Sequence, residues 1–215
     1  MLDLFAIEDV PWEATSPEVG LRNHILGIPG AGQPIKVTSI SQMVAGVLGR
    51  VLISYGGTGP AGTIQRLFIA GHGSPGHQSV GIGEGSDPTG NKELIGLGNG
   101  KLASQATGQL VSLASYFASN AVVTLGGCEA ADTPKGDFLL KAISLALGGI
   151  DVQGATGKQW SFMGPSGMVK RCTNGVVRNL GSLSSWPGPS PLTGGPVGGG
   201  GVAAVGSGIA AVGSR

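Results

Sequence analysis

Residues 67–74 read LFIAGHGS, and residues 121–129 read AVVTLGGCE. In each stretch a short, uncharged and partly β-branched run is followed at once by small residues, which is typical of a strand buried on both faces of a parallel sheet. Reacting groups collect at the carboxyl ends of strands in open α/β sheets. We therefore expect His72 and Cys128 to meet at one edge of such a sheet as a nucleophile pair.

The composition indicates one ordinary folded unit. The chain has 215 residues, of which 40% are hydrophobic and 12% charged, enough for a single core. A formal net charge of +1 and an aromatic content of 5% disfavour nucleic acid as a partner, because they provide neither a basic surface nor many stacking platforms. The two cysteines and three histidines show no metal-ligand spacing, so we expect no disulfide framework, no metal site and no cofactor.

Other elements are predicted from the spacing of apolar residues. Ser39 and Gln42 form a capping box before a run with helical spacing, and Gly56–Gly57 is expected to end that helix. The remaining expected elements are a strand at 33–37, a β-hairpin of 78–83 with 93–97, helices at 102–117 and 138–146, a strand from 150, and a terminal β meander over 160–180. The pattern predicts an α/β fold, a three-layer sandwich with a mostly parallel central sheet and helices on both faces.

We expect three regions along the chain. Residues 1–32 are interpreted as an irregular N-terminal segment with one strand, and residues 33–182 as the folded domain. Residues 183–215 are rich in glycine and proline and are interpreted as a flexible tail, because such a composition does not offset its own ordering entropy. Gly-x-x-x-Gly spacings within 196–214 leave a small-residue membrane helix as the alternative for the tail. The first nine residues lack the basic n-region of a Sec signal, which favours a cytoplasmic location or secretion by another route.

The two blocks resemble those of the caspase-like cysteine peptidases. This superfamily includes caspases, legumain, gingipains, separase, the bacterial CHAT peptidases and the self-processing domains of large clostridial and multifunctional autoprocessing toxins. Its members place a His-Gly after one strand and a Cys after the next, as Gly71-His72-Gly73 and Gly127-Cys128-Glu129 do here, and the toxin domains are the most similar. The similarity covers about residues 35–180. It implies a caspase-like domain over 33–182, a bacterial source and cysteine endopeptidase activity, with self-processing as one form.

The resemblance also implies roles for individual residues. Cys128 would attack a carbonyl carbon as a thiolate, with His72 as its proton-transfer partner. The amides of Gly73 and Cys128 would stabilise the oxyanion, and Gly127 would let the substrate backbone approach. Glu129 is a candidate for a pocket that accepts a basic substrate side chain, although the dipole of the following helix explains an acid there equally well. The expected partner is a protein or peptide substrate, including the chain itself, and no membrane partner is expected.

Two alternatives concern this site. A lone cysteine is more typical of a buried, inert thiol, and only the Gly71-His72-Gly73 block after the preceding strand favours a nucleophile. An inert Cys128 would make the chain a catalytically inactive caspase-like binding or structural module of a larger secreted or surface protein. His77 is a rival base, but its place in a loop favours a solvated or substrate-side residue. Cys172 falls in the expected meander and is interpreted as structural.

Overall fold

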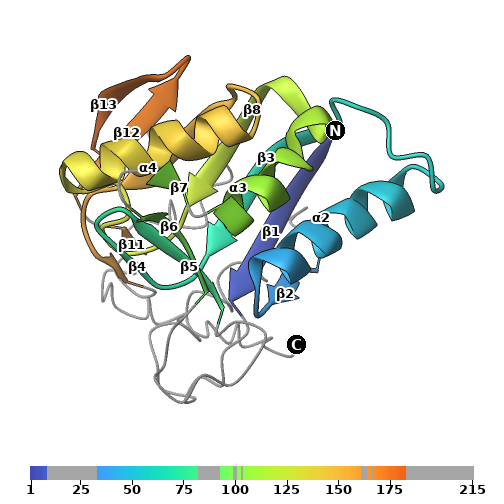
Figure 1. Cartoon of the computed structure of the whole chain (residues 1–215), viewed down its shortest axis with the longest axis horizontal. Coiled ribbons are helices and arrows are strands. Elements are labelled where there is room, and N and C mark those ends of the chain that lie inside the picture. The colour runs from blue at the N-terminus through green and yellow to red at the C-terminus, as the bar shows by residue number, and fades with distance from the viewer. Residues whose placement is uncertain are drawn as a thin grey trace, which may run out of the picture.

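A seven-stranded sheet forms the centre of the molecule (Figure 1). The computed structural model describes residues 1–8, 33–81, 93–98, 101–102, 104–160, 164–165 and 167–182. The strand order is β13-β12-β9-β8-β3-β1-β2. The bounds along the chain are β1 Leu2–Glu8, β2 Ile35–Val37, β3 Ile64–Ala70, β8 Phe117–Leu125, β9 Asp151–Ala155, β12 Met168–Thr173 and β13 Val176–Ser182. The strands β2, β1, β3, β8 and β9 pair in parallel with their neighbours, whereas β12 pairs antiparallel with both β9 and β13. This pairing confirms the α/β class with a mostly parallel sheet.

Strand β3 carries apolar side chains on both faces of the sheet. In β3, Leu67 and Ile69 belong to the main core, while Phe68 lies on the opposite face with its ring centroid 6.2 Å from that of Phe5. Such two-sided burial explains why these strands read as nearly continuous apolar runs. The final pairing of β3 with β8 matches Ile69 with Leu125, so the two strands end together.

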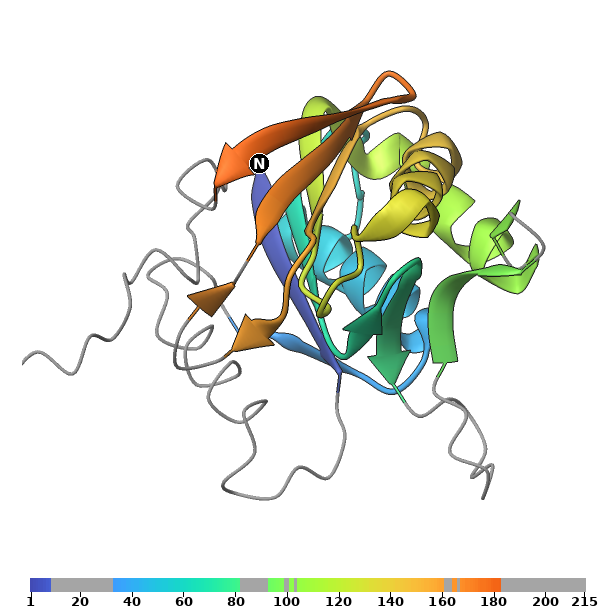
Figure 2. The same ribbon diagram turned by 90° about the vertical axis from the view of Figure 1, so that its left-hand side faces the viewer.

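Three α-helices lie side by side in one layer against the main core (Figures 1 and 2). They are α2 Ile40–Ser54, α3 Ser104–Val111 and α4 Thr133–Ala146, and α3 contacts both of the others. The connection between β1 and β2 lies outside the described residues, so the expected helices on the second face stay a prediction. Among the described helices none is both long enough and apolar enough to cross a membrane.

The helix α2 begins at the N-cap residue that the sequence predicts, Ser39. Ser39 Oγ accepts a hydrogen bond from the Gln42 amide at 3.0 Å. In a standard capping box the Gln42 side chain would accept from the amide of the N-cap residue, Ser39. Here Gln42 Oε1 accepts from the amide one residue earlier, that of Thr38, at 3.1 Å. After the helix, Gly56 and Gly57 adopt φ values of 63° and 90°, a conformation that favours glycine and ends the helix.

A small antiparallel sheet follows His72, as the predicted hairpin requires. Its strands are β4 Gly73–Ser74, β5 His77–Gly81, β6 Glu93–Gly98 and β7 Lys101–Leu102. Ser74 pairs with His77 across Pro75 and Gly76, and the φ of 81° at Gly76 fits the glycine position of a type II turn. The terminal β meander is also confirmed, since β12 and β13 pair antiparallel at the edge of the main sheet and the short pair β10 Gln159–Trp160 and β11 Gly164–Pro165 precedes them.

Two boundary predictions need correction. The helix expected over 102–117 ends at Val111, a 3-10 turn follows at Ala114–Tyr116, and Phe117 already belongs to β8, where it pairs with Ile64. Phe117 is buried and lies four residues after Leu113, which is the spacing expected within one helix. It is buried, however, as the first residue of β8. The segment 1–32 is not wholly separate either, because β1 lies inside the sheet between β3 and β2. The folded unit therefore includes residues 2–8, while the tail 183–215 lies outside the described residues.

Candidate active site

The carboxyl ends of β3 and β8 bring two glycine-containing segments together. The Gly126 amide donates to the carbonyl oxygen of Ile69 at 2.8 Å, one step beyond the last paired residues of the two strands. From this point the chain leaves the sheet as Gly71-His72-Gly73 on one side and Gly126-Gly127-Cys128 on the other. The predicted neighbourhood of the His and Cys segments is therefore present in the backbone.

These two segments touch so closely that only glycine fits. A Cβ atom at Gly73 would lie 2.6 Å from the Gly127 carbonyl carbon and 2.7 Å from both the nitrogen and the oxygen of Cys128. A Cβ at Gly127 would lie 2.8 Å from Gly73 Cα and 3.0 Å from the His72 carbonyl oxygen. The structure thus brings Gly73, Gly127, Cys128 and the main chain of His72 together.

The main chain of His72 is held from both sides. Its amide donates to Glu8 Oε2 at 2.8 Å, and its carbonyl oxygen accepts from the Ser79 amide at 2.8 Å. Glu8 is only 2% exposed at the end of β1, and its Oε1 accepts from the Ser79 hydroxyl at 2.8 Å. Sequence reasoning missed Glu8, although an acid that ends the apolar run LDLFAIE was a visible signal.

Gly127 has a different role from the predicted one. It is buried, and its amide donates to Gln78 Oε1 at 2.8 Å. The space that a side chain would need is filled by Gln78, Gly73 and His72. The missing side chain therefore makes room for the protein's own His72–Gly73 segment and not, as expected, for a substrate backbone.

Gly73 faces Gln78 in the β4–β5 ladder, and this pairing sets the direction of its amide. The preceding pair is bonded, since Ser79 donates to His72. Bonded and non-bonded pairs alternate in an antiparallel ladder, so the N–H and C=O of Gly73 point away from β5. The amides of Gly73 and Cys128 thus belong to touching segments, an arrangement that can place two donors around one developing oxyanion.

The two cysteines differ in environment. Cys128 is half-buried in the loop between β8 and α4. Cys172 is 0% exposed within β12, in agreement with its predicted structural place in the meander. Desolvation by burial raises the pKa of the Cys172 thiol, and a hydrogen bond with Ser144 offsets part of that rise. Cys172 is therefore poorly suited to act as a thiolate.

Glu129 lies directly after the cysteine in a strained turn. Its φ is 54°, its amide donates to the Gly157 carbonyl oxygen at 2.9 Å, and its own carbonyl oxygen accepts from the Asp132 amide at 2.8 Å. Its side chain is half-buried, and its proposed pocket stays a prediction.

His77 belongs to the hairpin and not to the β3–β8 edge. Its Nδ1 lies 3.2 Å from the Pro75 carbonyl oxygen and 3.4 Å from Ser74 Oγ. The ring thus contacts its own turn. Across the described ranges, no group of three or more His, Cys, Asp or Glu side chains could hold a metal ion.

The comparisons with protein family models, with curated proteins and with solved structures find no match to this chain. The fold and the site therefore define the class by themselves: an α/β protein in which a His-Gly segment and a Gly-Cys segment meet at the ends of neighbouring parallel strands.

Proposed function

We propose that the chain is a caspase-like cysteine endopeptidase with Cys128 as nucleophile and His72 as the proton-transfer residue. The observation that carries the proposal is the contact of the Gly73 backbone with the Gly127–Cys128 peptide at the ends of the adjacent strands β3 and β8. The half-buried state of Cys128 supports it as well, because a nucleophile must be reached by substrate.

The proposed reaction is acyl transfer to water. The Cys128 thiolate forms a C–S bond with the carbonyl carbon, and the π electron pair of the C=O bond moves onto oxygen. When the C=O bond re-forms, the C–N bond breaks and the amine leaves with a proton from the His72 imidazolium. Water then attacks the thioester while His72 takes a proton, and the carboxylic acid leaves as Cys128 is regenerated.

The amides of Gly73 and Cys128 are the proposed oxyanion donors. Both lie at the contact between the two segments, and the Gly73 amide points away from the β4–β5 ladder. Removing one donor from such a pre-organised site costs about 3 kcal/mol of barrier. The proposed substrate is a protein or peptide, with the chain itself as one candidate.

Alkylation of the two cysteines tests the proposal, because Cys172 is an internal control. With iodoacetamide at about pH 6, Cys128 should react roughly tenfold or more faster than Cys172, whose burial keeps it as a thiol. The His72→Ala variant should lose this preference, while His77→Ala should keep it. Equally slow labelling of both cysteines in the wild-type chain would overturn the proposal and favour the inactive binding or structural module.

Self-processing has its own test. Mass spectrometry of the purified chain, beside its Cys128→Ala variant, should show a truncated product only where the sulfur is present. Cys172→Ala is the matched control and should give the same products as wild type. Identical masses for the wild-type and Cys128→Ala chains would restrict the proposal to substrates other than the chain itself.

A further inference from the structure

One buried side chain joins the two segments of the candidate site. Gln78 is 0% exposed, although a side-chain amide is polar and belongs to a class that is mostly found at protein surfaces. Its Oε1 accepts from the Gly127 amide at 2.8 Å, and its Nε2 donates to the Ser79 carbonyl oxygen at 2.9 Å. A buried polar group that is satisfied on both sides holds its neighbours in one arrangement.

The hydrogen bonds of Gln78 have a clear direction. Because its oxygen faces a donor and its nitrogen faces the Ser79 carbonyl, with the His72 carbonyl oxygen 3.5 Å away, the side-chain amide fits in only one of its two orientations. Ser79 is in turn bonded to Glu8, which also accepts from the His72 amide. Gln78 therefore links the Cys128 segment to the parts of β5 and β1 that hold His72.

The position of Gln78 bears directly on the candidate oxyanion donors. In the segment before the nucleophile, the Gly126 amide is bonded to Ile69 and the Gly127 amide to Gln78, and the next amide along the chain is that of Cys128. On the other segment, Gln78 is the ladder partner of Gly73. The same residue thus sets the place of both Gly73 and the Gly127–Cys128 peptide.

We infer that Gln78 is a positioning residue that holds the Gly73 and Cys128 amides at the separation needed to bind an oxyanion. This inference rests on the proposed function. Gln78 itself is buried and acts through the two glycine segments, so it is not a catalytic residue. A misplacement of reacting groups by about 1 Å can cost on the order of 100-fold in rate, so a single buried hydrogen bond at this point can matter.

Two reactions of Cys128 separate positioning from nucleophilicity. Iodoacetamide forms a C–S bond at a tetrahedral carbon with loss of iodide, and no oxyanion develops. p-Nitrophenyl acetate is acylating: the thiolate attacks its carbonyl carbon, an oxyanion forms, and p-nitrophenolate leaves. The ester has no side chain to recognise, so the unknown cleavage specificity does not affect the result. The rate measured with Cys128→Ser is subtracted as background.

The main variant is Gln78→Leu, which keeps much of the volume and removes both hydrogen bonds. We expect ester acylation to fall roughly 10- to 100-fold, while iodoacetamide alkylation of Cys128 stays within about threefold of wild type.

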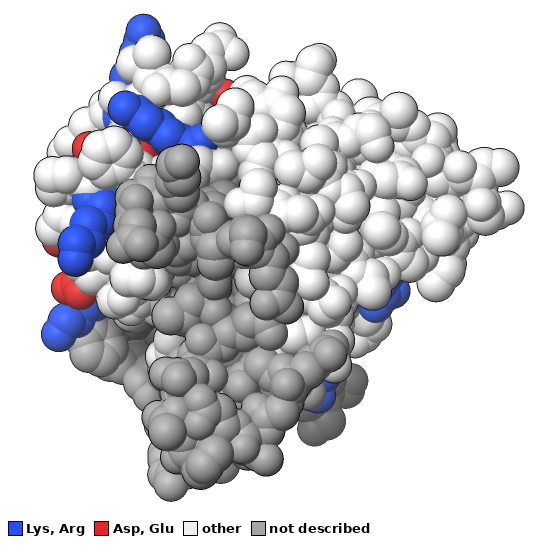
Figure 3. Space-filling view, viewed as in Figure 1, with Lys and Arg blue, Asp and Glu red and all other residues white. Residues whose placement is uncertain are grey.

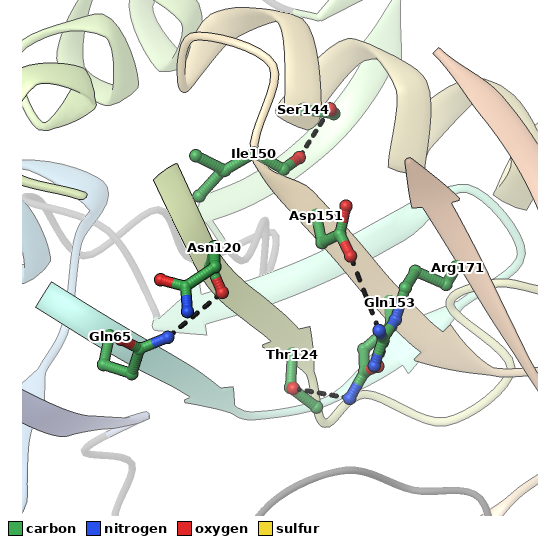
Figure 4. A network of polar contacts seen from close by, with 8 residues as sticks. All are labelled: Gln65, Asn120, Thr124, Ser144, Ile150, Asp151, Gln153 and Arg171. Carbon is green, nitrogen blue, oxygen red and sulfur yellow. Dashed lines mark hydrogen bonds and ion pairs between the residues drawn. The ribbon is translucent and has the colours of Figure 1, made fainter. Parts of the chain in front are cut away.

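Gln153→Leu is the matched control. Gln153 is also a 0% exposed glutamine, but it bonds Thr124 at 3.0 Å and Arg171 at 2.7 Å within the sheet (Figure 4). It should lose stability without this selective loss of acylation.

Gln78→Glu adds a pH signature that a purely structural role would not produce. An ionised glutamate can accept from the Gly127 amide but cannot donate to Ser79, whereas the protonated acid can do both. The ratio of variant to wild-type acylation rates should therefore increase as the pH falls. This variant also keeps the inference testable if Gln78→Leu does not fold.

The experiments distinguish a failure of the proposed peptidase function from a failure of the positioning role of Gln78. If wild-type Cys128 shows no preference over Cys172 with iodoacetamide, the proposed function fails and the inference falls with it. If wild-type Cys128 reacts selectively but Gln78→Leu changes neither reaction, or lowers both equally, only the positioning role is overturned. A flat pH ratio for Gln78→Glu would overturn it too.

Discussion

At the scale of single residues, the contact between the two segments of the site depends on side-chain volume more than on side-chain polarity. The contact between the His72–Gly73 and Gly127–Cys128 segments depends on two glycines whose missing side chains would meet backbone atoms. Backbone cannot move aside as the end of a flexible side chain can, so any added carbon must separate the segments. The glycines are thus required by the meeting of the strand ends, whichever activity the site carries.

Gly73→Ala tests this packing. Its added carbon would lie 2.6 Å from the Gly127 carbonyl carbon, so we expect a loss of about 1–3 kcal/mol in the free energy of unfolding. Urea denaturation measures this loss. Gly49→Ala is the control, because it lies within α2 with nothing within 4 Å of the new carbon, and it should gain about 1 kcal/mol from helix propensity. An equal response of the two variants would contradict the close contact.

Glu8 is the second residue whose effect can be measured. Glu8→Leu removes the acceptor of the His72 amide and of the Ser79 hydroxyl, and we expect it to destabilise the fold by about 1–3 kcal/mol because these donors lose their partner. Asp3→Asn is a matched change on the same strand, since it weakens the partly exposed ion pair with Arg66 and should cost less than about 1 kcal/mol. Denaturation curves that place Asp3→Asn as the more damaging change would contradict this assignment.

At the scale of elements, the excursion after β3 shapes the site. The turn of the β4–β5 hairpin packs against Lys135 in the first turn of α4, and the Gly76 amide donates to the Ala130 carbonyl oxygen, in the loop before α4, at 3.3 Å. β5 supplies Gln78 and Ser79, whereas the helices contribute mainly to the core below the strands. The site therefore depends on strand ends and on a short hairpin more than on any helix.

The α2 helix offers a prediction that leaves the site untouched. Ser39 caps its first turn and is buried, so Ser39→Ala should destabilise the protein by about 1 kcal/mol through loss of the bond from the Gln42 amide. Thermal unfolding followed by circular dichroism measures the effect. Alkylation of Cys128 should be unchanged at temperatures where the variant is folded, and a large change there would show that α2 acts on the site.

At the scale of the whole molecule, charged side chains gather on one side of the face that carries the helices. Figure 3 shows a largely uncharged surface over α2 and α3, with most of the visible lysine and arginine near α4, β12 and β13. On this side Lys170 Nζ of β12 lies 2.7 Å from Asp137 Oδ1 of α4, and a second ion pair joins Arg171 of β12 to Asp151 of β9 at 3.4 Å. Being partly exposed, such pairs stabilise the molecule only slightly.

The free energy of unfolding at alkaline pH should depend on the ionisation of the buried Cys172 thiol. Burial raises its pKa above 9.0, so the unfolded chain releases this proton first as the pH rises. Its contribution to stability is fully present below pH 9.0 and declines above it. Cys172→Val should lack this decline, so urea denaturation of both chains from neutral to alkaline pH should show wild type losing stability relative to the variant. A constant difference would contradict the pKa shift.

The sequence by itself determined the features that depend on local pattern. The apolar runs ending in Gly71-His72-Gly73 and Gly127-Cys128 predicted neighbouring parallel strands, and Ser39 with Gln42 predicted the start of α2. Each signal lies within a few residues, where strand or helix periodicity and capping chemistry act.

Only the tertiary structure decided the rest. It placed β1 inside the sheet, ended α3 before Phe117, and brought Glu8 and Gln78 against segments 64 and 49 residues away. These outcomes depend on which strands pair and on which buried polar groups satisfy one another. A local sequence pattern does not predict these pairings, because the free energy that favours them comes from contacts between distant parts of the chain.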